Sequence, residues 1–241
     1  MVIDMLSHIG VKKGEDYKVE SLLEIMDSTG VEKCMICSQL ETINNEYIHE
    51  CCEKYPDRTL GFAVINPWDV DGEEQLETCF RDYHFYGLKL NAIRFGYSAD
   101  RHSLLDPYFE LCRKYGKCVV VHGQSDMFSI PDKWAEMAKS FPEVPVVLYH
   151  IGVPMMYEQA CRLARDIPNF YLSTCGAYVP VIRMAYETAG AEKLLFSSDA
   201  PFGDQGQEIE KVRYICTDPE DQEKILWRNA AKMLRLERMK I

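Results

Sequence analysis

The sequence has no hydrophobic run long enough to cross a membrane. Its most apolar stretch, residues 144–157, is interrupted by His150 and Pro154, whereas a transmembrane helix needs about 20 consecutive apolar residues. The opening residues carry Asp4 and His8 inside their only apolar segment, which does not match the basic and then apolar order of a secretory signal peptide. We therefore expect a cytoplasmic protein with no membrane partner.

Positive charge is also scarce. The chain has 27 lysine and arginine residues against 38 aspartate and glutamate residues, a formal net charge of −11, and no block of basic residues. Proteins that hold nucleic acid depend on neutralising its phosphates with basic side chains. The charge balance therefore predicts no nucleic-acid partner and favours a small-molecule substrate.

Flexible linkers, low-complexity segments and short repeats are absent as well. All 241 residues, of which 47% are apolar, read as folded globular sequence. Single α/β barrels commonly run to about 200–250 residues. We expect one domain that spans residues 1–241.

Cysteine, in contrast, is abundant, with ten copies. Because cysteine can take part in redox chemistry or bind zinc, its pattern needs to be considered. Cys34 and Cys37 form a C-x-x-C pattern, but they lie in the run 33–38, which reads as a buried strand. Residues three apart on a strand point to opposite faces, so the two sulfur atoms are not expected to converge. No second cysteine pair with metal-ligand spacing follows, and the cysteines are predicted to be reduced, mostly buried thiols.

Apolar runs of strand length alternate with amphipathic stretches along the whole chain. The predicted strands span residues 2–8, 33–38, 59–66, 86–91, 118–122, 144–150, 170–174 and 193–199. The predicted helices span 18–29, 43–55, 72–83, 106–115, 131–141, 155–166, 179–189 and about 208–239, the last with a break near Pro219. Eight strand–helix units favour a (β/α)₈ TIM barrel. An open doubly wound sheet is the alternative, but the glycine-rich phosphate turn usual after its first strand is missing.

Polar side chains of one kind fall where several predicted strands end. His8, His122 and His150 each end an otherwise apolar strand, and Asp199 ends the last one. A single histidine in such a place is more often a hydrogen-bonded core residue. Three at the same rim of a barrel, where active sites lie, instead favour a metal site, because imidazole and carboxylate groups suit zinc and similar divalent ions.

At these positions the chain resembles the amidohydrolase superfamily, and within it the amidohydrolase-2 branch, which includes aminocarboxymuconate-semialdehyde decarboxylase-like enzymes. That branch typically carries I-D-x-H-x-H, G-x-K-L-H-P, a strand-five histidine, H-x-G, F-x-S-D-x-P and N-A-x-x-L along the chain. The corresponding segments here are Ile3-Asp4-Met5-Leu6-Ser7-His8, Gly87-Leu88-Lys89-Leu90-Asn91, His122-Gly123, His150-Ile151-Gly152, Phe196-Ser197-Ser198-Asp199-Ala200-Pro201 and Asn229-Ala230-Ala231-Lys232-Met233-Leu234.

The resemblance implies a barrel fold and a divalent metal, with zinc as the first expectation. By resemblance, His8 and His122 are metal ligands, and Asp199 ligates the metal or contacts the attacking water. His150 then polarises the substrate or moves a proton, so His150 and Asp199 are the expected catalytic residues. A homodimer is a further expectation from the resemblance.

Two departures from the motifs bear on that metal. Leu6 replaces the first histidine of H-x-H, and Asn91 replaces the strand-four histidine. Because residues 6 and 8 are two apart on a strand they face the same way, so we expect Leu6 to point an apolar side chain at a ligand position. Losing that ligand predicts weaker metal binding.

The expected substrate contacts come from strand four and the loop after it: Lys89, Asn91, Arg94 and Tyr97. Arg94 and Tyr97 would suit a substrate carboxylate, although Arg94 reads equally well as a solvated loop residue. Lys89 is expected to point into the barrel and to form an ion pair with Asp4. A Schiff-base lysine is a distant alternative.

The leading prediction is a metal-dependent hydrolase that acts on a small, carboxylate-bearing substrate through metal-activated water. Two other functions remain open on the same residues. One is decarboxylation of a small unsaturated or aromatic carboxylic acid. The other is a metal-free, degenerate barrel that binds a small ligand without turnover. Asn229 is expected to have a structural role, tying the last helix to the loop after strand eight.

Overall fold

The strands of the computed structural model, which describes residues 1–236, form one nine-stranded sheet in the order β2-β1-β3-β4-β5-β6-β7-β8-β9. Their bounds are β1 (Ile3–Lys12), β2 (Glu15–Tyr17), β3 (Lys33–Ser38), β4 (Thr59–Val64), β5 (Gly87–Leu90), β6 (Cys118–His122), β7 (Val146–Tyr149), β8 (Phe170–Ser173) and β9 (Leu194–Leu195). Only the β1–β2 pair is antiparallel, and the other neighbours are all parallel. This is the single barrel domain that the alternating pattern predicts.

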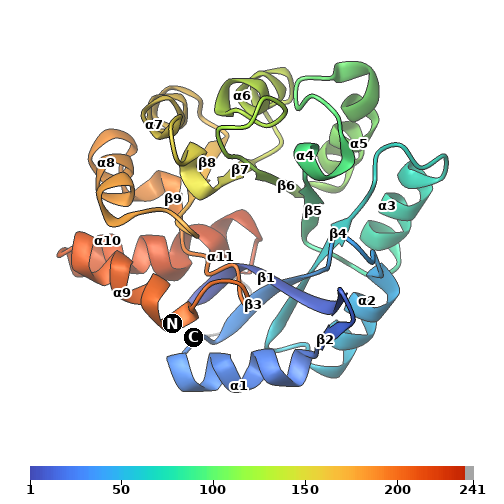
Figure 1. The fold of residues 1–241 in the computed structure, drawn as a ribbon, viewed down its shortest axis with the longest axis horizontal. Helices are drawn as coiled ribbons and strands as arrows, with labels where there is room; N and C mark the ends of the chain where they lie inside the picture. The colour runs from blue at the N-terminus through green and yellow to red at the C-terminus, as the bar shows by residue number, and fades with distance from the viewer. Residues whose placement is uncertain (237–241) are drawn as a thin grey trace.

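Helices surround the strands on the outside (Figure 1). The longer ones are α1 (Val19–Thr29), α2 (Asn45–Lys54), α3 (Gly72–Arg81), α5 (His102–Tyr115), α6 (Pro131–Ser140), α7 (Tyr157–Asp166), α8 (Val179–Ala189) and α9 (Gln205–Ile215). The shorter ones are α4 (Ala92–Phe95), α10 (Pro219–Glu223), α11 (Asn229–Met233), the 3₁₀ turns η1 (His150–Gly152) and η2 (Ala191–Lys193), and the π-helical turn η3 (Lys224–Arg228). No helix within residues 1–236 combines the length and apolarity needed to cross a bilayer.

The first strand closes the barrel by bonding to the segment that follows the last one. The Met5 amide donates to the Phe196 carbonyl oxygen (3.0 Å), and the His8 amide donates to that of Ala200 (2.8 Å). Two segments far apart in sequence, the first strand and residues 196–200, therefore lie side by side.

The core has two layers, as closed barrels require. The inner layer fills the barrel, and its members include Met5, Leu6, Met35, Cys37, Leu60, Phe62, Val64, Val120, Val147 and Tyr149. The outer layer lies between the strands and the helices. Cys37 belongs to the inner layer and Cys34 to the outer one. This confirms that the C-x-x-C sulfur atoms face opposite ways, and all ten cysteines are free thiols.

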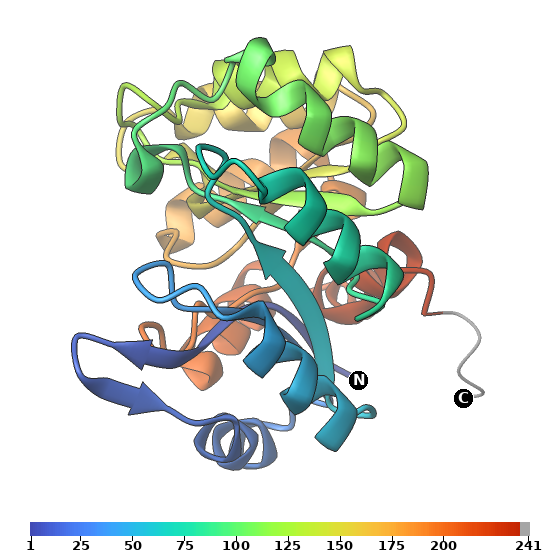
Figure 2. The same cartoon turned by 90° about the vertical axis from the view of Figure 1, so that its right-hand side faces the viewer.

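The first strand is longer than the sequence predicts. It continues past His8 to Lys12 and returns as β2, through a two-residue turn at Lys13 and Gly14 with φ of 52° and 86°. Two consecutive residues with positive φ suit the tight turn of a twisted hairpin. Figure 2 shows this hairpin projecting from the barrel at the end opposite the N-terminus. The glycines of this segment read as a loop in the sequence, and the hairpin was therefore not predicted.

The last strand is shorter than predicted, since only Leu194 and Leu195 join the ladder. The chain then leaves extended geometry at Asp199, whose φ is +63°. The predicted break in the C-terminal helical region is confirmed at Pro219, where α10 begins. The predicted helix to residue 239 runs past the last described residue.

Candidate active site

A pocket of about 210 Å³ opens at the carboxyl ends of the barrel strands. It is lined by Leu6, His8, Lys12, Gln39, Leu40, Glu41, Lys89, Asn91, His122, His150, Asp199 and Phe202. The three rim histidines and the aspartate singled out from the sequence thus share one pocket. They arrive from opposite sides of the barrel, because parallel strands present all their carboxyl ends at one face.

His8 lies beside Asp199, with Nε2 3.6 Å from the carboxylate Oδ1 atom. Its other ring nitrogen, Nδ1, lies 3.3 Å from the Ser38 carbonyl oxygen. A carbonyl can only accept, so Nδ1 carries the hydrogen and Nε2 presents a lone pair to Asp199. Burial, and then the charge of Lys89, lower the pKa of His8 to about 3. His8 is therefore neutral at pH 7.

His122 and His150 meet edge to face, with ring centroids 5.0 Å apart. Nδ1 of His150 lies 3.1 Å from the Cys175 carbonyl oxygen, which again leaves Nε2 as the acceptor. Burial lowers the pKa of both rings, to about 3 for His122. The pocket therefore holds three neutral imidazoles.

His150 and Asp199 both have left-handed backbone conformations, with φ of +65° and +63°. Such values cost energy in residues that carry a Cβ, and they cluster at functional sites. Burial raises the pKa of Asp199, although the nearby His150 and Lys89 act in the opposite direction. Asp199 therefore keeps a proton to a higher pH than an exposed aspartate does.

Lys89 is almost fully buried, with 2% of its surface exposed. Its Nζ atom lies 4.0 Å from the centroid of the Tyr149 ring, within cation–π range. Burial lowers the pKa of Lys89. No salt bridge joins this ammonium group to a carboxylate in residues 1–236.

The predicted ion pair between Lys89 and Asp4 is wrong. The Asp4 carboxylate instead accepts hydrogen bonds from the Ser198 amide (2.9 Å) and from Gln205 Nε2 (2.8 Å). The register of β1 is irregular between Asp4 and Ser7. Such a bulge breaks the alternation of faces along a strand, so Asp4 does not share the inward face of Leu6 and His8.

Of the four expected substrate contacts, two line the pocket. These two residues are Lys89 and Asn91. Asn91 Oδ1 also caps α4, because it accepts a hydrogen bond from the Arg94 amide at 3.0 Å. The Arg94 side chain is 43% exposed and faces Glu41 at 4.0 Å, outside the lining. Tyr97 is buried in the outer core layer and is not part of the lining either.

Sequence reasoning missed four pocket residues: Lys12, Gln39, Leu40 and Glu41. Gln39 follows directly after β3, so its place one residue beyond a strand end was a usable signal. Gln39 was missed because only histidine and aspartate residues were considered at the strand ends. Lys12 reaches the pocket only through the β1–β2 hairpin, and it lies 3.7 Å from the centroid of the Phe202 ring.

The pocket does not fit a metal in the way that the sequence predicts. No group of three histidine, cysteine, aspartate or glutamate side chains within residues 1–236 is arranged to hold a metal ion. Catalytic zinc needs three protein ligands. Leu6 contributes an apolar side chain to the lining that also holds His8, and the amino group of Lys89 occupies the same pocket.

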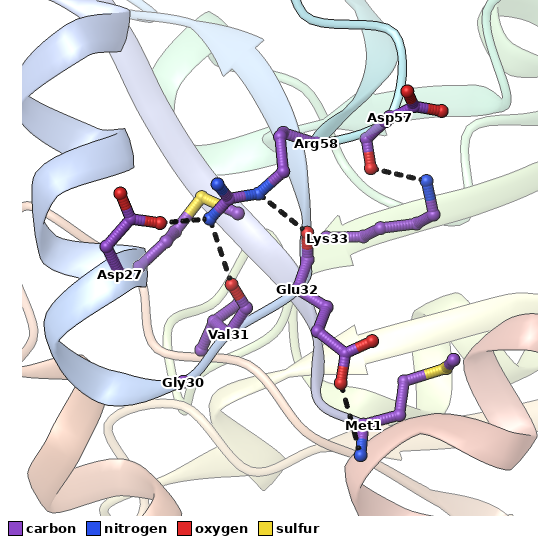
Figure 3. Close-up of a pocket in the computed structure, with 9 residues that line it drawn as sticks. Met1, Asp27, Gly30, Val31, Glu32, Lys33, Asp57 and Arg58 are labelled. Atoms are coloured by element: carbon purple, nitrogen blue, oxygen red, sulfur yellow. Dashed lines mark hydrogen bonds and ion pairs between the residues drawn. The ribbon is translucent and has the colours of Figure 1, made fainter.

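A second hollow, of about 560 Å³, lies at the opposite end of the barrel (Figure 3). Its charged groups are paired with each other. Arg58 binds Asp27 at 2.7 Å, and the N-terminal amine lies 3.3 Å from Glu32. The Lys33 ammonium donates to the Asp57 carbonyl oxygen. In contrast to Lys89, these cations are already neutralised or hydrogen-bonded.

A parallel barrel with a polar pocket at its carboxyl-end rim defines the class as a TIM-barrel enzyme fold. The amidohydrolase family model matches residues 26–236. The chain therefore belongs to the amidohydrolase-2 family.

Individual relatives agree with this assignment. The chain is 22% identical to the γ-resorcylate decarboxylase of Polaromonas sp. strain JS666, over 80% of this chain and 76% of that protein. The 2,6-dihydroxybenzoate decarboxylase from Rhizobium superposes with a TM-score of 0.78 at 18% identity, covering 98% of this chain and 99% of the other. A dihydroxybenzoic acid decarboxylase from Polaromonas sp. JS666, with bound manganese and 2-nitroresorcinol, gives 0.78 at 17% identity, with 99% and 98% covered.

Proposed function

We propose that the protein is a carboxy-lyase that removes carbon dioxide from a small aromatic or unsaturated carboxylic acid. The observation that carries the proposal is that an acid with a raised pKa, Asp199, and a buried cation, Lys89, line the same small pocket. Decarboxylases among the relatives of the chain support this reaction over the hydrolysis that the sequence first suggested.

The reaction has a simple balance. An aromatic carboxylate takes up one proton and yields the arene and carbon dioxide. The bond between the ring carbon and the carboxyl carbon breaks, its electron pair stays on the ring, and the incoming proton occupies the vacated position. The site therefore needs a proton donor close to the ring and a group that holds the carboxylate.

Asp199 is the proposed donor. Burial raises its pKa, so it keeps its proton to a higher pH than an exposed aspartate, which is the direction that a general acid requires. His8, with its Nε2 lone pair 3.6 Å away, is placed to orient the acid. His150, fixed through Nδ1, presents an Nε2 lone pair to the pocket. The Asp199 side chain is 25% exposed, so solvent water returns its proton after each turnover.

No step in this mechanism passes through a metal, because the donor groups of the pocket do not form a three-ligand set. The sequence-based prediction of zinc on His8, His122 and Asp199 remains a prediction that elemental analysis of the purified protein decides. A manganese-dependent reaction, as the bound ion of the Polaromonas structure suggests, would appear as activation of carbon dioxide release by added Mn²⁺.

The experiment compares two sets of substrates. One contains carboxylic acids such as 2,6-dihydroxybenzoate, and the other contains esters, lactones and amides of similar size. We expect turnover of acids only, with carbon dioxide released in a 1:1 ratio to the loss of substrate. Turnover confined to the hydrolysable set would overturn the proposal. Tight binding of acids with no turnover of either set would favour the non-catalytic barrel.

A further inference from the structure

The buried amino group of Lys89 forms no direct salt bridge within the described part of the chain, although the Asp199 carboxylate, which lines the same pocket, favours its charged form. It is 2% exposed, is covered on one side by the Tyr149 ring at 4.0 Å, and forms no salt bridge there. An uncompensated charge away from water is costly. Such a group is stabilised when an anion enters the pocket that it lines.

Neutral hydrogen-bond donors line the pocket together with this cation. Gln39 is 1% exposed, and its Nε2 atom has no acceptor among residues 1–236. The Oδ1 atom of Asn91 is used by the Arg94 amide, which leaves the Nδ2 group as a donor. An unpaired cation with two amide donors is a set that matches a carboxylate, which accepts at both of its oxygens.

The same pocket does not assemble a metal ligand set. Leu6 lies at the rim beside His8, and no three ligating side chains within residues 1–236 are placed around one ion. The two observations point the same way, because the pocket already contains the amino group of Lys89 and does not offer a ligand set for a metal ion.

We infer that Lys89, with Gln39 and Asn91, forms a metal-independent carboxylate site, in which the lysine ammonium supplies the positive charge that a divalent ion would otherwise bring. The ligand class is a small planar monocarboxylate that fits about 210 Å³. This inference rests on the proposed function for its substrate class, but it concerns binding and is tested without turnover.

Binding of benzoate to protein treated with EDTA, measured by isothermal titration calorimetry, tests the inference. Benzamide has the same shape without the charge and serves as the matched ligand. We expect benzoate to bind without added metal and about 100-fold more tightly than benzamide, because a buried charge pair is worth that much. Equal binding of the two ligands, or benzoate binding only after Mn²⁺ or Zn²⁺ is added, would overturn it.

Variants assign the effect to Lys89. Lys89→Met should lose about 100-fold in benzoate affinity, whereas Lys33→Met, which removes a buried lysine at the opposite end of the barrel (Figure 3), should lose none. Unchanged benzoate binding in Lys89→Met would refute the role of the lysine. If Lys89→Met does not fold, the comparison of benzoate with benzamide on the wild-type protein still tests whether the pocket is a metal-independent carboxylate site.

The outcomes also separate this inference from the proposed function. Metal-free, Lys89-dependent benzoate binding without carbon dioxide release from any acid would support the inference and reject the carboxy-lyase proposal. Carbon dioxide release that appears only with added metal, together with metal-dependent benzoate binding, would support the lyase and reject the inference.

Discussion

His8 Nε2 lies 3.6 Å from Asp199 Oδ1, so the first barrel strand and the segment after the last one contribute one side-chain pair to the pocket. The pair depends on barrel closure, since the Asp199 amide donates to the Leu6 carbonyl oxygen at 3.0 Å. In the lyase proposal, this contact holds the proton donor in place.

Asp199→Asn should abolish most of the activity without unfolding the protein. The amide has nearly the same shape, but it cannot deliver a proton to the ring carbon, and loss of a general acid costs about 10²–10⁴-fold in rate. The measurement is kcat for carbon dioxide release, with the melting temperature as the control. A variant that keeps more than a tenth of the wild-type kcat would remove Asp199 from its proposed role.

Leu6→His should create metal binding. The substitution adds a fourth imidazole to the pocket, beside His8. Even loss of a group that only supports a metal ligand typically costs about 10–100-fold in metal affinity. We expect at least that gain for Zn²⁺, measured by competition with a chromogenic chelator. Leu6→Asn, which is polar but a poor zinc ligand, serves as the control. Equal zinc affinity in wild type and Leu6→His would contradict this picture of the rim.

The buried histidines should make stability depend on pH. The pKa of His122 is about 3 in the folded protein against 6.5 for an ordinary histidine, so between these values only the unfolded chain binds the proton. This contribution to stability is complete above pH 6.5 and is lost as the pH falls towards 3. When the pH is lowered from 7 to 5, the free energy of unfolding should therefore fall by about 2 kcal/mol less in His122→Asn than in the wild type.

Urea unfolding of both proteins at the two pH values provides the measurement. Asp4 acts in the opposite direction, because burial raises its pKa to about 6 and its stabilisation is lost as the pH rises from 3.8 to 6. Taking the difference between wild type and variant cancels this common contribution. Parallel stability curves for the two proteins would show that His122 titrates normally in the folded state.

Asn229 should matter for stability and not for binding. Its Nδ2 group donates to the carbonyl oxygens of Ala191 and Leu194, each at 2.8 Å. This ties α11 to the start of β9, and not to the loop after that strand as predicted. Asn229→Ala leaves both carbonyls without this donor and should cost about 2 kcal/mol of unfolding free energy. Lys232→Ala, on an exposed position of the same helix, should cost less than about 0.5 kcal/mol. Equal losses would contradict the assignment.

The barrel and its rim could be predicted because both follow from local pattern. Apolar runs such as 118–121 specify buried parallel strands, and the residue at the end of each run, such as His122, lies at the carboxyl-end rim in any barrel. The side of the molecule that carries the pocket was therefore predictable before any contact was known.

What escaped prediction depends on departures from regular geometry. The irregular register between Asp4 and Ser7 turns Asp4 away from Lys89, and a bulge of this kind leaves no mark in the pattern of apolar residues. The hairpin turn at Lys13 and Gly14 reads as a loop, so the approach of Lys12 to the pocket was hidden. The isolation of the Lys89 charge is a property of the packed barrel as a whole.

The most direct test of the account follows the carboxyl carbon of the substrate. The protein is incubated with carboxyl-¹³C-labelled 2,6-dihydroxybenzoate in D₂O, and the products are observed by NMR. We predict labelled carbon dioxide or bicarbonate in a 1:1 ratio with an arene that carries one deuterium at the vacated ring carbon, and loss of both signals in Asp199→Asn. Substrate that remains fully labelled, across this and other small aromatic acids, would contradict the central claim.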